Sequence, residues 1–280
     1  MTDRETLPGE TAKGAGPFIT LRTYRHHGAG VRWRARQHRK GLSRHPDQTD
    51  VPVWQRAAYN WWTGLCFSVG SLLFMLGALL SVLPYSLAPV QIARMFFLGS
   101  IPFTIAGFLQ NFQAANATEF SKDAPGPPRR VHLLGWRPHD PGWLSTITQF
   151  AGTIAFNFNT FDAINPVDGW YLQDLTIWLP GMIGSVLFLL SGYLAFVETG
   201  HAYWSWRPRD LDWQIVFINL LGCIFFMVAG LLAYIPKGPE PGWVADLANI
   251  HLFFGALCFL TGALLMMRES RQVETLGSNA

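Results

Sequence analysis

Polar side chains inside otherwise apolar stretches are the residues most able to do chemistry in this chain. Asn157 and Asp162 lie within one helical turn of Asn159. A carboxylate beside two amides could hold a cation, a proton or a small polar solute if the group opens to water. Alternatively, Asp162 lies in the outer membrane interface and has no such role. The sequence leaves both interpretations open.

Two further amides occupy equivalent positions in different stretches. Gln149 and Asn219 each precede a glycine of a recurring motif, Gly152 and Gly222, by three residues. On helices they would share the face that carries the motif. A hydrogen bond between them near the cytoplasmic side would contribute about 0.6 kcal/mol, the average measured between membrane helices.

Several kinds of chemistry are disfavoured by what the sequence lacks. His251 is the one histidine inside an apolar stretch, so a haem with two histidine ligands is not expected. Cys66, Cys223 and Cys258 are odd in number and apolar in context, which argues against disulfides and zinc. Glu198 and His201 form an i, i+3 pair suited to proton handling. Nucleotide-binding loops and paired catalytic carboxylates are missing, so an enzyme is the least favoured class of function, and we expect no cofactor and no metal.

The composition and the apolar runs of the chain predict that these residues lie in a membrane protein. Half of its 280 residues are hydrophobic and 14% are charged, against about 25% in soluble domains. No charged residue occurs from 57 to 93. Apolar runs of bilayer length predict an all-α polytopic bundle of six transmembrane helices. The predicted spans are 59–83, 92–112, 143–164, 175–197, 213–235 and 248–267.

The basic residues predict how these spans are oriented. Segments 1–58, 113–142, 198–212 and 268–280 carry 11, 4, 2 and 2 Lys/Arg. The intervening loops 84–91, 165–174 and 236–247 carry Lys237 alone. Positive charge accumulates on the cytoplasmic side. We therefore expect an inner-membrane protein with both termini cytoplasmic.

One short motif recurs six times, as Gly, three residues, Phe, two residues and, except once, a small residue. Its members are Gly70 and Phe74, Gly99 and Phe103, Gly152 and Phe156, Gly184 and Phe188, Gly222 and Phe226, and Gly255 and Phe259. Asn159 takes the small position of the third copy. Membrane helices associate through close packing at small residues, so we expect each stripe to face inward, with rings filling the notches of neighbouring helices.

A longer repeat overlies this motif. The segment Trp136-Arg-Pro-His-Asp140-Pro-Gly-Trp143 recurs 70 residues later as Trp206-Arg-Pro-Arg-Asp210-Leu-Asp-Trp213. Aspartate before the helix predicts an N-cap in both copies, although substrate binding is the alternative. The expected interfacial anchors are Trp54, Trp61, Trp136, Arg137, Trp143, Trp206, Arg207 and Trp213.

These patterns divide the chain into a tail and three repeated hairpins. The hairpins are 51–113, 143–198 and 199–272, with a cytoplasmic loop at 114–142 and a short tail at 273–280. Residues 1–50 are expected to be mostly disordered, with a short helix within 31–40 as an option. The basic run 22–40 could be solvated or attract anionic lipid headgroups. No nucleic-acid module accompanies it, so nucleic acid is not an expected partner.

Three copies of the motif carry serine after the glycine: Gly70-Ser71, Gly99-Ser100 and Gly184-Ser185, followed by Phe74, Phe103 and Phe188. In this they resemble YrhK-like membrane proteins. The resemblance implies paired-helix membrane units of no established activity, and it implies no catalytic residues.

Three classes of function remain open at this point. A membrane scaffold or sensor, with a protein partner or a second copy of the chain, fits the long basic tail and the packing motifs. A small-solute, proton or ion pathway fits the polar side chains of the third span. A membrane-embedded enzyme is the third class.

Overall fold

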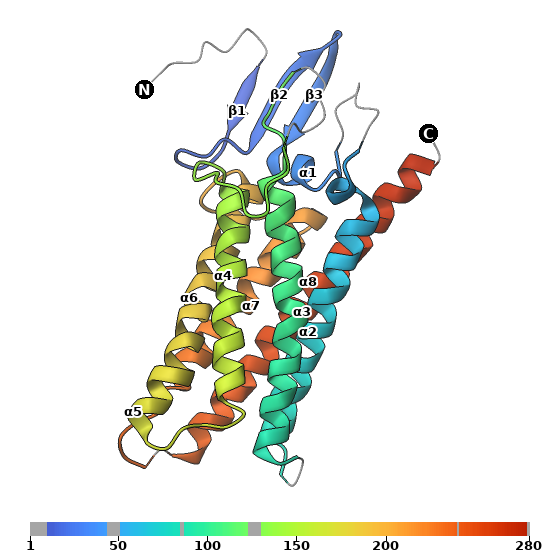
Figure 1. Cartoon of the computed structure of the whole chain (residues 1–280). Helices are drawn as coiled ribbons and strands as arrows, with labels where there is room; N and C mark the ends of the chain where they lie inside the picture. Colours follow the sequence, from blue (N-terminus) through green and yellow to red (C-terminus); the bar gives the residue numbers. More distant parts are fainter. Residues whose placement is uncertain (1–9, 44–50, 85–86, 123–129, 240, 279–280) are drawn as a thin grey trace.

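A computed structural model describes residues 10–43, 51–84, 87–122, 130–239 and 241–278, and in the last helix it describes side chains as far as residue 272. Six long helices form the body of the protein. They are α2 (Ala57–Val82), α3 (Pro89–Ala115), α4 (Pro141–Asp162), α6 (Leu179–Gly200), α7 (Leu211–Leu232) and α8 (Gly242–Ser278). Each packs against the next in this order, and α8 packs against α2 (Figure 1). The bundle is therefore a closed ring of helices.

Five segments are long and apolar enough to cross a bilayer. Four lie in α2, α3, α7 and the first part of α8, to Gln272. The fifth, Trp170–Gly200, joins α5 (Trp170–Gln173), the π-helix η2 (Asp174–Trp178) and α6. The predicted mostly helical, multi-pass membrane bundle is thus confirmed. Helix α4 does not meet these limits, because its amides and Asp162 lower its hydropathy.

Glycine and phenylalanine of the recurring motif meet reciprocally in each helix pair α2–α3, α4–α6 and α7–α8. A Cβ added to Gly70 would lie 2.4 Å from the Phe103 ring, and one added to Gly99 would lie 3.0 Å from the Phe74 ring. The other pairs repeat this arrangement: Gly152 with Phe188, Gly184 with Phe156, Gly222 with Phe259, and Gly255 with Phe226. Close backbone approach and van der Waals contact therefore hold each pair together.

The six motif rings fill the centre of the helix ring. Phe103, Phe188 and Phe259 contact one another with centroids 5.9–6.4 Å apart. On the other helices, Phe226 lies 6.0 Å from Phe74 and 5.8 Å from Phe156. The void among these rings measures about 10 Å³, at most room for a single water molecule. At this depth the space among the described helices is filled by an aromatic core.

The basic tail folds into a small domain at one end of the bundle, where α8 also ends (Figure 1). Strands β1 (Thr11–Lys13), β2 (Leu21–His26) and β3 (Ala29–Arg34) form an antiparallel sheet, followed by α1 (Ala35–Arg39). Positive φ at His27 and Gly28 permits the tight turn between β2 and β3. The prediction of disorder is therefore wrong for residues 10–43, while 1–9 and 44–50 lie outside the described residues.

Hydrophobic contacts within and below the sheet explain this outcome. Tyr24 is buried against Phe120, with ring centroids 5.3 Å apart, and Trp33 packs on the same ring at 5.4 Å. Tyr24 and Trp33 share one face of the sheet, because Tyr24 lies opposite Val31 and Trp33 lies opposite Arg22 in the strand register. The helix expected within 31–40 is restricted to Ala35–Arg39.

We expect Gly70→Ala to destabilise the bundle by about 1–3 kcal/mol, the usual cost of overpacking. The added Cβ would lie 2.8 Å from the Gly99 carbonyl oxygen, which belongs to the backbone and cannot rotate away. Gly107→Ala is the matched control, because its Cβ would meet nothing closer than 3.4 Å. Thermal unfolding in detergent should show a lower Tm for Gly70→Ala alone, and equal values would contradict the packing described.

Candidate functional site

Acidic side chains occur at fixed distances from the motif glycines, at the end of the bundle that carries the tail domain. Glu198 and Glu269 each follow their motif glycine by fourteen residues, and Gln113 is the equivalent residue of α3. On the preceding helix of each pair, ten residues before the glycine, the equivalent residues are Asn60, Gly142 and Asp212. The helix pairs therefore bring no carboxylate, one carboxylate and two carboxylates to this layer.

Helix α1 and its C-cap residue Lys40 supply the opposing charges. Arg36 donates to Asp212 at 2.5 Å and to Glu269 at 2.6 Å, and Lys40 donates to Glu269 at 2.5 Å. Arg39 pairs with Glu198. Except for Arg39, 11% exposed, each of these side chains is less than 10% exposed. Three cations thus meet three carboxylates, as burial requires, because an unpaired charge here would be strongly unfavourable.

Hydrogen bonds of neutral side chains hold α1 over the uncharged helix pair. The Asn60 amide donates to the Lys40 carbonyl at 2.8 Å, and the Gln113 amide donates to Asn60 Oδ1 at 3.2 Å. His38 Nε2 lies 2.9 Å from Thr118 Oγ1. The neutral polar side chains of α2 and α3 therefore orient the backbone of α1, while α6, α7 and α8 neutralise its side chains.

Gly142 is the small residue that gives the Arg39–Glu198 pair its space. A Cβ at this position would lie 1.6 Å from Arg39 Nη1 and 2.5 Å from Glu198 Oε1. The equivalent positions Asn60 and Asp212 carry side chains that contact α1 directly. Each helix pair therefore meets α1 in a different way.

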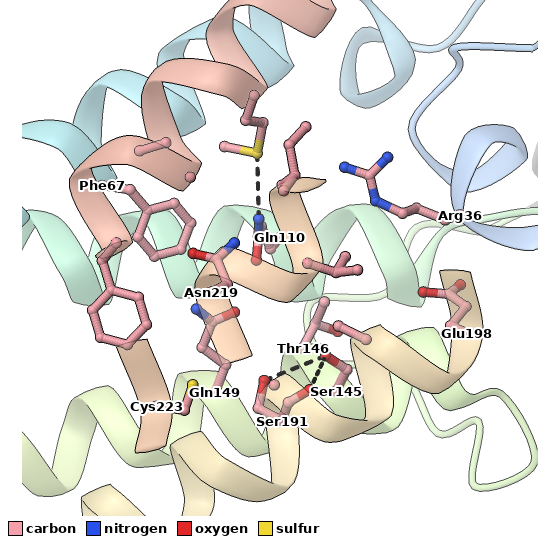
Figure 2. Close-up of a pocket in the computed structure, with 18 of the residues that line it drawn as sticks. Arg36, Phe67, Gln110, Ser145, Thr146, Gln149, Ser191, Glu198, Asn219 and Cys223 are labelled. Carbon is pink, nitrogen blue, oxygen red and sulfur yellow. Dashed lines mark hydrogen bonds between the residues drawn. The ribbon is translucent and has the colours of Figure 1, made fainter. Parts of the chain in front are cut away.

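Below α1 lies a polar cavity of about 90 Å³. Its wall includes the amides Gln110, Gln149 and Asn219 and the hydroxyl groups of Ser145, Thr146 and Ser191 (Figure 2). Phe67, Phe103, Phe188 and Phe259 line the side toward the aromatic core, while Arg36, Arg39, Lys40 and Glu198 line the side toward α1. The volume accommodates several water molecules or one small polar solute.

One carboxylate oxygen in this wall lacks a partner in the described structure. Glu198 is 1% exposed, and its Oε1 accepts from Arg39 while its Oε2 accepts from no described residue. A buried oxygen of this kind requires water or a ligand donor. The cavity is therefore suited to bind water or a small polar molecule.

The predicted polar residues separate into two groups. Gln149 and Asn219 both line the cavity, but the hydrogen bond predicted between them is not present among the described residues. Asn157 instead donates to Thr104 Oγ1 on α3 at 2.9 Å, and Asn159 donates to the Ile177 carbonyl at 2.8 Å. Asp162 is half-buried at the end of α4. Asn157, Asn159 and Asp162 therefore do not form one site.

The asparagine at position 159, where the other copies of the motif have a small residue, has a local structural explanation. Residues Asp174–Trp178 form a π-helix, whose wider turns remove carbonyls from regular α-helical pairing. The Asn159 amide satisfies one of them, that of Ile177, and it packs against Gly181. Sequence reasoning missed this partner because the π-helix has no signal in the motif.

Not all tryptophans expected to be interfacial anchors are exposed. Trp143 and Trp213 are 4% and 2% exposed, and their indoles donate to the carbonyls of Leu134 and Ser205. The anchor prediction is therefore wrong for these two residues. Trp136 and Trp206 are 81% and 64% exposed, as anchors require, while Trp54 and Trp61 are half-buried. The N-caps Asp140 and Asp210 are confirmed by bonds from Gly142 and Asp212 amides.

His201 joins the tail domain to the bundle. Its Nδ1 lies 2.9 Å from Thr20 Oγ1, and its φ of 55° ends α6. Burial, followed by the charges of Arg207, Arg34 and Arg32, lowers the pKa of His201 to about 4. Glu198 binds Arg39 and His201 binds Thr20, so the i, i+3 pair expected from the sequence has separate partners.

Replacing Glu269 by glutamine should release the tail domain from the bundle. It leaves Lys40 without a carboxylate, and breaking one partner from a buried pair costs about 3–5 kcal/mol. Hydrogen exchange of residues 20–40 in nanodiscs should become faster, while α2–α8 stay protected. Asp168→Asn makes the same charge change at an exposed site and should leave exchange unaltered. Equal protection in both variants would show that the charges do not hold the tail.

Docking should weaken as the pH falls from about 6.5 to about 4. The undocked His201 has an ordinary pKa near 6.5 and takes up a proton in this window, whereas the docked residue stays neutral. His201→Asn removes the titration, and asparagine tolerates the left-handed backbone. Exchange of residues 20–40 should accelerate with acid more in the wild type than in this variant. Superimposable pH profiles would exclude the role of His201.

Comparisons of the chain with protein families, with curated proteins and with solved structures find no match. The resemblance to YrhK-like membrane proteins therefore stays a prediction.

Proposed function

We propose that this chain is an inner-membrane scaffold or sensor whose tail domain docks on the helix bundle and is released from it. The observation that carries this proposal is the match between the three cations Arg36, Arg39 and Lys40 and the three buried carboxylates below them. A tail that served only to set topology would have no need for such a fit. Release would expose three positive charges to an acidic partner and open the polar cavity.

The sensor proposal rests on the shared wall between α1 and the cavity. A molecule bound among Gln110, Gln149 and Asn219 would lie next to the guanidinium groups that hold the tail. Occupancy of the cavity and docking of the tail would then influence each other by the same free energy. The tail domain would report the state of the membrane-embedded cavity to the cytoplasm.

The membrane arrangement proposed with this function has six spans in three repeated hairpins. Support for α4 as the sixth span comes from its outer face, where Ile154, Phe158 and Phe161 are exposed as lipid-facing residues would be. Its amides Asn157 and Asn159 point instead to α3 and η2. The reciprocal glycine and phenylalanine contacts support the hairpin repeat, and the distribution of Lys and Arg supports cytoplasmic termini.

A small-solute, proton or ion pathway is the second candidate, favoured by the polar cavity itself. In this case α1 would close the cytoplasmic mouth of a pathway. The aromatic core argues for the first candidate, because six packed rings separate the cavity from the other end of the bundle, with a void of about 10 Å³.

Labelling of single cysteines tests the membrane arrangement. With the native cysteines replaced by alanine, cysteines at the exposed positions Ser121 and Arg209 should react from the cytoplasmic side, and one at Gly238 from the other. An impermeant maleimide on intact cells and on inverted vesicles distinguishes the sides. Labelling of Ser121→Cys and Arg209→Cys from opposite sides would rule out six spans.

Flux through proteoliposomes tests the function. We expect wild type and Glu269→Gln to pass K⁺, protons and glycerol no faster than empty vesicles, because the aromatic core stays closed when the tail is released. Asp168→Asn controls for the charge change. Flux that appears in Glu269→Gln alone would replace the sensor by a gated pathway.

A further inference from the structure

The arginines of the two Trp-Arg-Pro segments, Arg137 and Arg207, differ in the contacts of their guanidinium groups. Arg207 Nη2 donates to the Thr199 carbonyl at 2.6 Å, and its Nη1 lies 3.7 Å from Asp210. The guanidinium group of Arg137, its equivalent, has no partner among the described residues. A cation held at the same motif position, but without the internal acceptor, is available for an external anion.

Arg137 lines a groove of about 350 Å³ between the tail domain and the bundle. Arg22, Trp33 and His38 form the tail side, and Trp136, Arg137 and His139 form the bundle side. This volume falls within the range of small-molecule sites, about 300–1,000 Å³. It far exceeds that of a bare inorganic anion, so an occupant would have a larger body attached to its charged group.

The chemistry of the groove favours an oxyanion. The Arg22 guanidinium carbon lies 4.6 Å from the Phe120 ring centroid, which holds this cation in place. Three carboxylates also line the groove: Asp140 caps α4, Glu119 is exposed, and Glu198 pairs with Arg39 through Oε1 while its Oε2 has no partner among the described residues. The Trp33 indole N–H is buried without an acceptor in the described structure. The guanidinium groups of Arg137 and Arg22 and one residue with an unmet N–H donor, Trp33, therefore lie among the residues that line one groove.

We propose that this groove binds the phosphate group of an anionic phospholipid, with Arg137 as its main ligand. Trp136, 81% exposed, stands beside Arg137 where an interfacial residue would meet headgroups. The proposal rests on the docking function proposed above and names its ligand. Free phosphate esters share the same chemistry, but the size of the groove and its exposed tryptophan favour a lipid.

One wall of the groove belongs to the tail domain and the other to the bundle, so a ligand that contacts both walls would hold the tail domain on the bundle. A phosphate that contacts both Arg137 and Arg22 would have a higher affinity for the docked state, in which these two residues line one groove, than for the released state. Anionic lipid would then shift the equilibrium toward docking. The tail domain would respond to the lipid composition of the cytoplasmic leaflet.

Hydrogen exchange of residues 20–40 in nanodiscs tests this inference. Discs of phosphatidylcholine alone are compared with discs that also contain phosphatidylglycerol, for the wild type, Arg137→Ala and Arg209→Ala. Arg209 is exposed in the second copy of the segment and controls for net charge. We expect phosphatidylglycerol to slow exchange in the wild type and in Arg209→Ala. Arg137→Ala should lose about fivefold of this slowing, the factor for one basic residue at an anionic surface.

A further arm adds inorganic phosphate or glycerol phosphate to phosphatidylcholine discs. Slower exchange there, lost in Arg137→Ala, would keep the phosphate site but overturn its assignment to lipid. An equal loss in Arg137→Ala and Arg209→Ala would reduce the effect to general surface charge and overturn the site. Failure of the docking function itself is distinguishable, because exchange would then be fast in every disc and unaffected by Glu269→Gln.

Discussion

Pairing of three buried cations with three buried carboxylates is the constraint on which the rest of the structure depends. Without Arg36, Arg39 and Lys40, the helix ends would hold Glu198, Asp212 and Glu269 without counter-charges near an apolar bundle. Without the carboxylates, α1 could not lie over the cavity. The sheet β1–β3 gives α1 its position, so charge pairing at α1 adds to the apolar contacts of Tyr24 and Trp33 with Phe120.

The bundle tolerates this polar layer because its tightest helix packing occurs at a different depth, around the motif glycines and phenylalanines. Reciprocal contacts of glycine and phenylalanine hold the helix pairs at mid-depth, in a largely apolar layer. Toward the tail, the same helices replace aromatic residues with Gln110, Gln149 and Asn219. One set of helices thus combines a rigid aromatic core with a polar cavity that a docked element can close.

The sequence was sufficient for the parts of this arrangement that depend on local composition. Hydropathy located the long helices, the motif indicated which faces meet, and Asp140 and Asp210 were recognisable caps. The pairing of Glu198, Asp212 and Glu269 with the tail was not predicted, because charges at span ends usually face water. A signal was present: they lie at fixed distances from the motif glycines, and Arg36, Arg39 and Lys40 are spaced i, i+3, i+4, on one helical face. Strand pairing and the π-helix opposite Asn159 depend on tertiary contacts that no local pattern records.

The energetics of buried ion pairs make this cap suited to switching. Removing the six charged groups from water costs several kcal/mol for each ion, and their mutual attraction returns an amount of similar size. The difference between docked and released states is therefore small compared with either contribution. A ligand that binds one state with modest preference, whether in the cavity or in the groove, can then decide which state prevails. An apolar interface of the same area would bind the tail permanently and leave nothing to regulate.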